Sequence, residues 1–333
     1  METKVLKPNK MNIKLAAKLI NNGEIIGFPT ETVYGLGADA FNESAVKKIF
    51  QAKNRPSDNP LIVHIQDTSQ LVELTYELTE LEKRIINSFW PGPLSIVLKS
   101  KEKVPKVVTA GLDTIAVRLP AHPVAKEIIK EAKVPIAAPS ANISGKPSAT
   151  SAQHVFNDFE SKIPLIIDGG KSDFGLESSV IRVLEGQIVI LRPGAITREM
   201  LSKIAPTTLS KNHEDTTPAS PGIKHPHYHP NAKIILVKGM NYEEISNKVK
   251  KINNPNRRQA FFGFEKISSS DNFFKYSEVK GDNRLYDYAQ NLYSFFRDCD
   301  QLGVDEIIIH QVPLIGLGHA IMNRIEKASD EIF

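Results

Sequence analysis

Residues 23–65 read GEIIGFPTETVYGLGADAFNESAVKKIFQAKNRPSDNPLIVHI, and this stretch decides the fold. Two short apolar runs, at 24–28 and 61–65, predict buried strands, because each is bounded by glycine, proline or polar residues. A glycine-spaced polar loop follows the first run, and the pattern over 43–52 predicts a short helix. Strand, loop, helix and strand in such close succession are typical of a domain that mixes α and β elements.

The loops at the ends of these strands carry chemical groups that suit an anionic ligand. Lys53 and Arg55 lie in a loop bounded by prolines, and the Asn59 amide and the His64 imidazole follow shortly after. Loops held on a rigid scaffold are where binding chemistry usually lies, and paired cations at such a place favour phosphate or carboxylate. From the residues alone, a solvated pair of loop charges is the alternative.

Composition indicates an ordinary globular protein. The chain has 333 residues, 41% hydrophobic and 24% charged, and its formal net charge of +4 permits a nucleic-acid contact without arguing for one. The single cysteine, Cys299, excludes an internal disulfide and a cysteine-based zinc cluster. The N-terminal segment lacks the apolar core of a signal peptide, and no run approaches the about 20 apolar residues that span a bilayer. We expect a cytoplasmic protein with no membrane contact.

Predicted strands and helices are interspersed over the first 205 residues without strict alternation. This pattern predicts an α/β or α+β domain at 1–205 with a twisted, partly antiparallel sheet. The predicted strands lie at 24–28, 61–65, 94–98, 114–119, 135–138, 164–168, 179–184 and 187–191, and the predicted helices at 43–52, 68–88, 122–132, 151–157 and 197–204.

The character of the sequence changes at Pro206. Residues 206–232 are polar, rich in proline, threonine, serine and histidine, and almost without apolar periodicity, so we interpret them as a linker. In residues 233–333 strands alternate with helices, which predicts a small parallel, Rossmann-like domain. Its predicted strands lie at 233–237, 259–264 and 306–310, and its predicted helices at 242–252, 285–301 and 318–328.

Six motifs, taken in order, resemble the YrdC/Sua5 family, the threonylcarbamoyl-AMP synthases. One motif alone would be a weak signal, but six at family-like spacing are specific. The resemblance covers about residues 10–205 and implies a twisted sheet surrounded by helices. The motifs are PTETVYGLG at 29–37, KNRPSDNPL at 53–61, RLP at 118–120, SANISG at 140–145, ESSV at 177–180 and LRPG at 191–194.

The resemblance implies an enzyme that combines L-threonine, bicarbonate and ATP into threonylcarbamoyl-AMP and pyrophosphate. Such a product supplies the threonylcarbamoyl modification of adenosine 37 in tRNAs that read ANN codons, through a tRNA-modifying transferase complex. The chemistry is adenylyl transfer, which depends on positioning and charge neutralisation more than on covalent catalysis. Mg²⁺ is expected with the ATP, with no metal held by protein side chains.

The resemblance also implies roles for particular residues. Lys53 and Arg55 are the implied catalytic cations, acting together with Ser140 and Asn142. The family usually has threonine where this chain has Ser179, and the serine keeps the hydroxyl. The implied L-threonine contacts are Thr32, His64, Arg118, Ser140, Ser178 and Ser179, and the implied ATP contacts are Arg55, Asn59, Thr114, Asn142, Thr150, Arg192 and Tyr228.

Within the linker, SPGIKHPHYHP at 220–230 resembles the segment that covers the pocket in this family. The three histidines at alternate positions could also indicate a metal site, but no other ligand cluster accompanies them, so we do not favour that interpretation. The segment is therefore interpreted as a lid. The implied lid residues are Ser220, Pro221, Gly222, His227 and Tyr228, and the alternating histidines are His225, His227 and His229.

Two functions of a different kind stay open at this point. One is a non-catalytic module that holds double-stranded RNA on a basic concave face, for which the lysine-rich stretch at 99–106 would allow weak RNA binding. No aromatic residues interleave with these lysines for stacking, which counts against it. The other is an enzyme that uses carbamoyl phosphate, but the cysteine-rich segments expected there are missing. Ser140 and Asn142 could equally build a turn.

Overall fold

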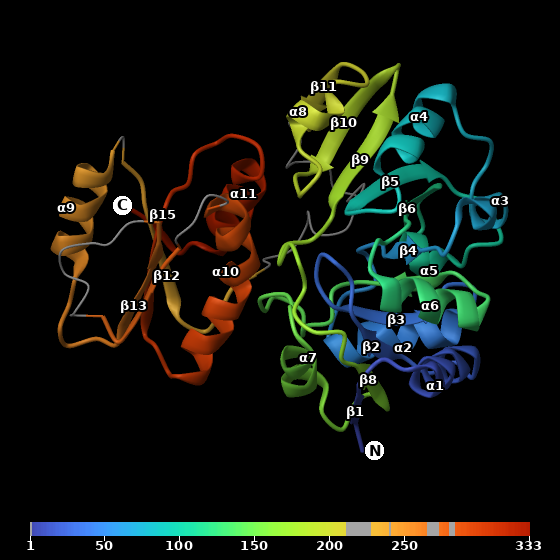
Figure 1. The fold of residues 1–333 in the computed structure, drawn as a ribbon, viewed down its shortest axis with the longest axis horizontal. Coiled ribbons are helices and arrows are strands. Elements are labelled where there is room, and N and C mark those ends of the chain that lie inside the picture. Colours follow the sequence, from blue (N-terminus) through green and yellow to red (C-terminus); the bar gives the residue numbers. More distant parts are fainter. Residues whose placement is uncertain (1, 211–227, 240, 265–272, 280–283) are drawn as a thin grey trace. The chain divides into compact units, whose positions relative to one another are not determined.

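The computed structural model describes residues 2–210, 228–239, 241–264, 273–279 and 284–333. Contacts within the chain divide it into two compact units, each described here by itself (Figure 1). The first unit comprises Met1–Ser144 with Ser148–His225, and the second comprises Gly145–Pro147 with Pro226–Phe333.

The first unit is built on an eleven-stranded sheet in the order β1-β8-β2-β3-β7-β4-β6-β5-β9-β10-β11. Parallel pairs such as β4 with β6 stand beside antiparallel pairs such as β5 with β6, which confirms the predicted mixed sheet. The strands are β1 (Lys4–Leu6), β2 (Ile26–Phe28), β3 (Gly35–Asp39), β4 (Ile62–His64), β5 (Leu94–Lys99), β6 (Thr114–Arg118), β7 (Ile136–Ala138), β8 (Leu165–Ile167), β9 (Ser179–Leu184), β10 (Gln187–Arg192) and β11 (Thr207–Leu209).

Most helices of the first unit begin at a side chain that caps the free backbone N–H groups. Asn9 accepts from Asn12 N at the start of the first helix, and Ser151 accepts from His154 N at the start of another. The helices are α1 (Lys10–Asn21), α2 (Glu43–Lys53), α3 (Leu71–Leu74), α4 (Glu80–Phe89), α5 (Lys106–Thr109), α6 (Pro123–Ala132), α7 (Ala152–Phe159) and α8 (Arg198–Leu201), and a 3₁₀ turn covers Thr68–Gln70.

Helices cover the two faces of this sheet unevenly. A large apolar cluster on one face joins the sheet to α2, α4 and α7, and a smaller cluster joins β2, β7 and β8 to α1 and α6. A third cluster, on β4, β5, β6 and β9, consists of Ile62, Val97, Ala116 and Val180 and includes no residue from a described helix. Alternate residues Val63, Ile96, Val117 and Ile181 belong to the large cluster.

Because successive strand residues point to opposite faces, the third cluster defines a face of β4, β6, β5 and β9 that can carry polar groups. Ile62 on this face places His64 there too, and Ala116 places Thr114 and Arg118 there. We call it the site face, because three residues with predicted ligand contacts lie on it.

The structure corrects two parts of the predicted fold. The region expected as one helix at 68–88 is broken, because Thr75 is extended and Thr79 forms a capping box with Glu82 that begins α4. The polar loop after Phe28 contains a further strand, β3, whose Gly37 lies against the Phe28 ring. A Cβ on Gly37 would be 2.7 Å from the Phe28 ring, so the close packing requires glycine.

The first sheet reaches beyond Pro206, where the predicted linker begins. Strand β11 pairs in parallel with β10 through Thr207 and Leu209. Residues 211–227, which hold most of the predicted lid, lie outside the described residues.

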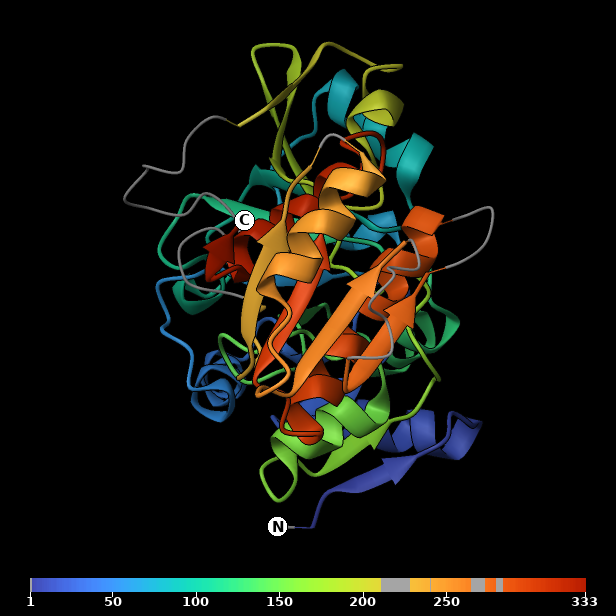
Figure 2. The ribbon, with the colours of Figure 1, turned by 90° about the vertical axis from the view of Figure 1, so that its left-hand side faces the viewer.

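The second unit is the predicted small α/β domain. Its strands β12 (Lys233–Val237), β13 (Gln259–Gly263), β14 (Lys275–Glu278), β15 (Glu306–His310) and β16 (Glu331–Ile332) form a sheet in the order β14-β13-β15-β12-β16, and each adjacent pair is parallel. Helix α9 (Tyr242–Ile252) lies on one face, and α10 (Arg284–Gln301) and α11 (Gly318–Ala328) lie on the other (Figures 1 and 2). The arrangement confirms the Rossmann-like prediction.

None of the helices in the described ranges combines the length and the apolar character that crossing a bilayer requires.

Candidate active site

A buried cluster lies at one end of the site face, where β4 and β6 end. Their last residues, His64 and Arg118, are ladder partners. Arg118 is held by three bonds: Nη1 donates to Thr32 Oγ1 (2.8 Å), Nη2 donates to Glu31 Oε1 (2.5 Å), and Nε donates to the Gly92 carbonyl (3.2 Å). A guanidinium has five N–H donors, so its position is set while donors remain for a ligand.

Glu31 is a site residue to which the sequence assigned no role. Its carboxylate and the Arg118 guanidinium are 4% and 3% exposed, so the ion pair is fully desolvated. Burial alone would raise the pKa of Glu31, but the charge and hydrogen bond of Arg118 outweigh it, and the pKa lies below its usual value. The second carboxylate oxygen accepts from His122 N (3.3 Å). Glu31 and Arg118 are 87 residues apart in the sequence, which is why no local pattern revealed the ion pair.

His64 is held neutral beside this ion pair. Burial, followed by the positive charge of Arg118, lowers the pKa of His64 to about 3. Its Nδ1 is buried with no hydrogen-bond partner among the described residues, and the ring meets Phe28 edge-on at 6.1 Å between centroids. A neutral imidazole with an unused ring nitrogen can bond a hydroxyl or an amine of a small ligand.

Ser178 lies beside the same end of the sheet and is bonded to two other buried groups. Its hydroxyl is 2.8 Å from Ser95 Oγ and accepts from Arg192 Nη2 at 3.1 Å. Arg192 Nε also donates to the Ser178 carbonyl at 3.1 Å. The structure therefore joins a predicted threonine contact to a predicted ATP contact. Ser95 had no motif to mark it.

Ser179 points away from the site face. It lies in line with Ile181, which belongs to the large core cluster, and its hydroxyl donates to Ile196 O (2.7 Å) and accepts from Ile196 N (3.0 Å). Gly194 packs directly on this backbone, since a Cβ there would overlap Ser179 N and approach Ser178 C to 2.8 Å. These bonds give Ser179 a structural task, holding the turn after β10, and its contact with threonine stays a prediction.

A second polar cluster lies at the opposite end of the site face. The Lys53 ammonium is 1% exposed and donates to the carbonyls of Ser140 (2.6 Å) and Asn142. Ser140 Oγ in turn donates to Asn142 Oδ1 at 2.5 Å. The predicted grouping of Lys53 with Ser140 and Asn142 therefore has a geometric basis, although the bonds of Lys53 run to backbone carbonyls.

Arg55 and Asn59 extend this second cluster. Arg55 Nη2 donates to the carbonyls of Asn59 (3.2 Å) and Pro60 (3.3 Å), and the side chain lines a pocket of about 350 Å³. The Asn59 amide is 1% exposed, and neither its oxygen nor its nitrogen bonds to a described residue. A buried amide without partners is costly unless a ligand bonds it.

The two clusters are separated along the strands. Thr114 and Arg118 lie at the two ends of β6 on the same face, so about 13 Å separates their positions at about 3.3 Å per residue. The register of β4 against β6 and β7 places Thr114 and Ser140 at the Lys53 end, away from His64. Ser140 is also the bridge partner of Gly35, three residues after Thr32, so the loop that carries Thr32 runs between the two clusters. The threonine contact of Ser140 stays a prediction.

Two predicted ATP contacts lie outside both clusters. Thr150 is fully buried, and its Oγ1 is 3.3 Å from His154 Nδ1. Tyr228 belongs to the second unit, where its ring stacks on Tyr293 (5.5 Å between centroids) and lies under the Arg324 guanidinium. The other predicted lid residues, 220–222 and 227, lie outside the described residues. The nucleotide contact of Tyr228 stays a prediction.

The described residues hold no group of three or more histidine, cysteine, aspartate or glutamate side chains that could bind a metal ion. His225 and His227 lie outside those residues, and His229 lies 3.0 Å from the Asp330 carboxylate.

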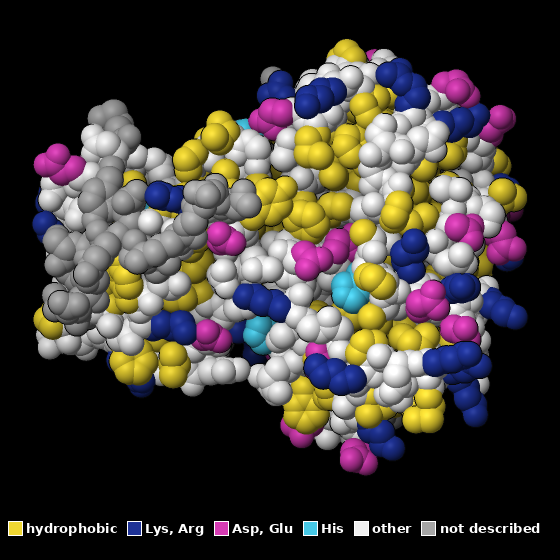
Figure 3. Space-filling view, viewed as in Figure 1, with side chains coloured by type: hydrophobic (Ala, Val, Ile, Leu, Met, Phe, Trp, Pro, Cys, Tyr) yellow, Lys and Arg dark blue, Asp and Glu magenta, His cyan; other side chains and the backbone are white. Residues whose placement is uncertain are grey.

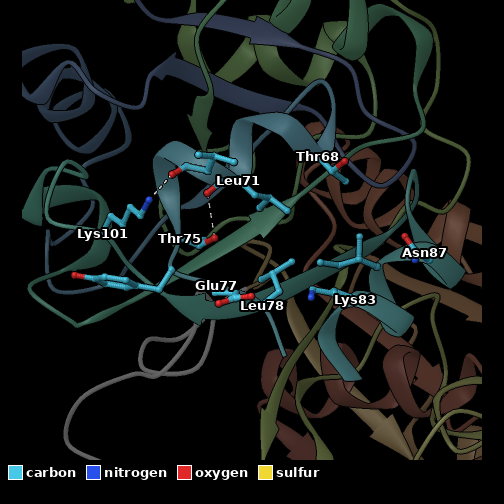
Figure 4. Close-up of a pocket in the computed structure, with 11 residues that line it drawn as sticks. Thr68, Leu71, Thr75, Glu77, Leu78, Lys83, Asn87 and Lys101 are labelled. Carbon is cyan, nitrogen blue, oxygen red and sulfur yellow. Dashed lines mark hydrogen bonds between the residues drawn. The ribbon is translucent and has the colours of Figure 1, made fainter. Parts of the chain in front are cut away.

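The lysine-rich stretch at 99–106 is engaged by neighbouring side chains. Lys99 lies over the Tyr76 ring (5.3 Å), and Lys103 lies over Phe41 and pairs with Glu73. A nearby pocket of about 520 Å³, between α3 and α4, is lined by none of the predicted site residues (Figure 4). On the face seen in Figure 3, lysine and arginine are interspersed with acidic side chains over the first unit.

Comparison with known proteins assigns the family. Residues 18–194 match the family described as telomere recombination, which groups the Sua5, YciO and YrdC proteins. Residues 196–330 match the family described as the threonylcarbamoyl-AMP synthase C-terminal domain. Two curated threonylcarbamoyl-AMP synthases align over nearly the whole chain. The synthase of Pyrococcus abyssi is 44% identical to this chain, and the alignment covers 95% of this chain and 94% of the relative. The synthase of Bacillus subtilis is 43% identical, and the alignment covers 98% of this chain and 95% of the relative.

Solved structures of this family are similar to the chain in fold. P. abyssi Sua5 complexed with L-threonine superposes with a TM-score of 0.91 at 40% identity, covering 99% of this chain and 98% of its own. Escherichia coli YciO, at 22% identity and a TM-score of 0.51 over 57% of this chain and 93% of its own, shares the fold of the first unit. The fold and these relatives define an enzyme of the adenylyl-transfer type. The chain belongs to the YrdC/Sua5 family, the threonylcarbamoyl-AMP synthases.

Proposed function

We propose that this chain makes threonylcarbamoyl-AMP and pyrophosphate from L-threonine, bicarbonate and ATP. The observation that carries the proposal is the alignment with the P. abyssi synthase, which runs along nearly the whole of both chains. A non-catalytic RNA-binding module is not favoured, because relatives of that similarity are synthases and because Lys99 and Lys103 of the basic stretch contact side chains within the unit.

The polar cluster at the end of β4 and β6 suits a small amino acid. Arg118 offers a fixed guanidinium to the substrate carboxylate. His64, neutral and with an unused Nδ1, offers an acceptor or donor to a hydroxyl. The support is chemical complementarity between the cluster and an amino acid: the Arg118 cation suits the carboxylate, and the neutral His64 imidazole suits the hydroxyl.

The Lys53 cluster suits the part of the reaction where negative charge accumulates. Threonine's amine attacks the bicarbonate carbon and water departs, which gives a carbamate. A carbamate oxygen then attacks the α-phosphorus of ATP while pyrophosphate departs. Lys53 is held rigidly by two carbonyls, and Arg55 faces an open pocket, so the pair can orient and neutralise phosphate oxygens. The site face extends about 13 Å along β6 from Arg118 to Thr114, which leaves room for a substrate that extends from amino acid to phosphate.

Mg²⁺ would enter with the triphosphate, whose oxygens would supply ligands to it. When bound, it would neutralise phosphate charge. We further propose a cytoplasmic location and transfer of the product to a tRNA-modifying enzyme complex, the consumer that the labile adenylate requires.

The test is threonine-dependent pyrophosphate release from ATP and bicarbonate. A site built to bond a hydroxyl strongly rejects analogues that lack it, so L-threonine should stimulate release far more than L-valine. Labelled threonine should appear in an adenylate by mass spectrometry. Equal stimulation by the two amino acids, or absence of the adenylate, would contradict the proposal.

A further inference from the structure

Ser95 is a fully buried serine that no sequence motif marked. Its strand neighbours Leu94 and Ile96 belong to the large core cluster, so the alternation of β5 turns Ser95 onto the site face together with Val97. Ile96 pairs with Val117 in the antiparallel ladder, and the next pair along places Ser95 beside Arg118. A hydroxyl thus lies at 0% exposure within the polar cluster.

The contacts of Ser95 form a short chain of three buried groups. Its Oγ lies 2.8 Å from Ser178 Oγ, which is its only hydrogen-bond partner among the described residues. Ser178 Oγ also accepts from Arg192 Nη2 at 3.1 Å. Ser178 and Arg192 are 2% and 6% exposed, so water is largely excluded from the chain.

An inventory of the hydrogens shows what each direction of this hydrogen-bond chain leaves unbonded. Arginine has only donors, so Arg192 must donate to Ser178, and a hydroxyl has one hydrogen and two lone pairs. In either direction one buried hydroxyl hydrogen has no acceptor among the described residues, which is costly unless a ligand accepts it. If Ser178 donates to Ser95, the unused hydrogen belongs to Ser95; if Ser95 donates, both lone pairs of Ser178 are used and the unused hydrogen belongs to Ser178, the predicted substrate contact, where a ligand oxygen can accept it.

We propose that Ser95 is a positioning residue that fixes the Ser178 hydroxyl as a hydrogen-bond donor toward an acceptor oxygen of the amino-acid substrate. The inference rests on the proposed function, since it takes Ser178 as a contact to that substrate. The acceptor is a carboxylate oxygen, because the neighbouring Arg118 selects the same group. Ser95 itself touches no substrate and acts only through Ser178.

The test is a double-mutant cycle on L-threonine affinity, measured by isothermal titration calorimetry without ATP. Ser95→Ala and Ser178→Ala should each weaken binding by about tenfold, the effect of one buried hydrogen bond. The double variant should be no weaker than Ser178→Ala, because Ser95 acts through that hydroxyl. Losses that multiply to about a hundredfold would overturn the inference, as would unchanged affinity in Ser95→Ala.

Two further measurements separate this role from a structural one. Ser95→Cys, which keeps a weak donor, should bind L-threonine more tightly than Ser95→Ala; equal binding by the two variants would count against a donor role. Ser246→Ala removes a buried serine hydroxyl from α9 and should leave the affinity unchanged. If the wild-type protein fails to bind L-threonine, the proposed function is contradicted. If the wild type binds L-threonine but the affinity losses of Ser95→Ala and Ser178→Ala multiply in the double variant, only the role of Ser95 is contradicted.

Discussion

Replacing His64 with glutamine should make the first unit less sensitive to acid. Burial and the charge of Arg118 lower the pKa of His64 to about 3 in the folded protein, whereas a histidine in the unfolded chain takes up a proton near pH 6.5. The unfolded state therefore binds the proton first as the pH falls. Stability is lost as the pH drops below about 6.5, and the loss continues until about pH 3.

The size of the effect follows from this difference in pKa. One proton bound only by the unfolded state changes the free energy of unfolding by about 1.4 kcal/mol per pH unit, which integrates to about 2 kcal/mol between pH 7 and pH 5. Glu31, whose pKa is lowered from 4.5, contributes stability that is lost at lower pH, as its carboxylate protonates. The window from pH 7 to pH 5 therefore separates the contribution of His64 from that of Glu31, and His64→Gln should remove the His64 part of the dependence.

The chain offers a reporter for the unit in question. Trp90 is the only tryptophan, and its Nε1 donates to the Leu94 carbonyl within the first unit. Urea unfolding followed by tryptophan fluorescence at several pH values gives the free energy of unfolding for wild type and His64→Gln. His122, whose pKa is also lowered by burial, contributes equally to both proteins. An identical pH dependence in the two proteins would refute the reasoning.

Three other changes test separate parts of the site. Arg55→Ala should lower the rate of pyrophosphate release by about 10²–10³ with the fold intact; near-normal turnover would return Arg55 to a solvated loop charge. Gly194→Ala should destabilise the first unit by more than about 1 kcal/mol in the urea assay, because its Cβ overlaps the backbone of Ser179. Glu31→Ala should cost about 3–5 kcal/mol by leaving Arg118 buried and unpaired, and an unchanged unfolding midpoint would argue against that pair.

Local patterns predicted the elements well but missed contacts between distant residues. Alternation placed Arg118 within an apolar strand, and the structure puts it on the site face as that pattern required. The partners that fix it could not be read locally, since Glu31 lies on another loop and Ser95 looked like one more residue of an apolar strand. Where the prediction of a single helix at 68–88 failed, a signal was available: Thr79 and Glu82 have the spacing of a capping box.

Among the site residues, too, the sequence motif reveals less than the three-dimensional structure. Ser178 and Ser179 are adjacent in the ESSV motif, and the resemblance alone assigns both to threonine. Only the three-dimensional alternation separates them, because one hydroxyl meets Arg192 and the other holds Ile196. A motif therefore indicates which segment is involved, while the sheet determines which side chain of the segment can meet a ligand.

The contact of Gly37 with Phe28 has a consequence for how variants of this enzyme would be interpreted. A side chain at 37 would press on the Phe28 ring and on Ile136, and both of these flank His64: Phe28 meets the imidazole edge-on, and Ile136 is its ladder partner. In a screen of point variants, Gly37→Ala would thus score as a defect in substrate recognition although no substrate contact is predicted for residue 37. The growth or activity of Gly37 variants would therefore report how the His64 imidazole is placed, through the intervening Phe28 ring and Ile136 side chain.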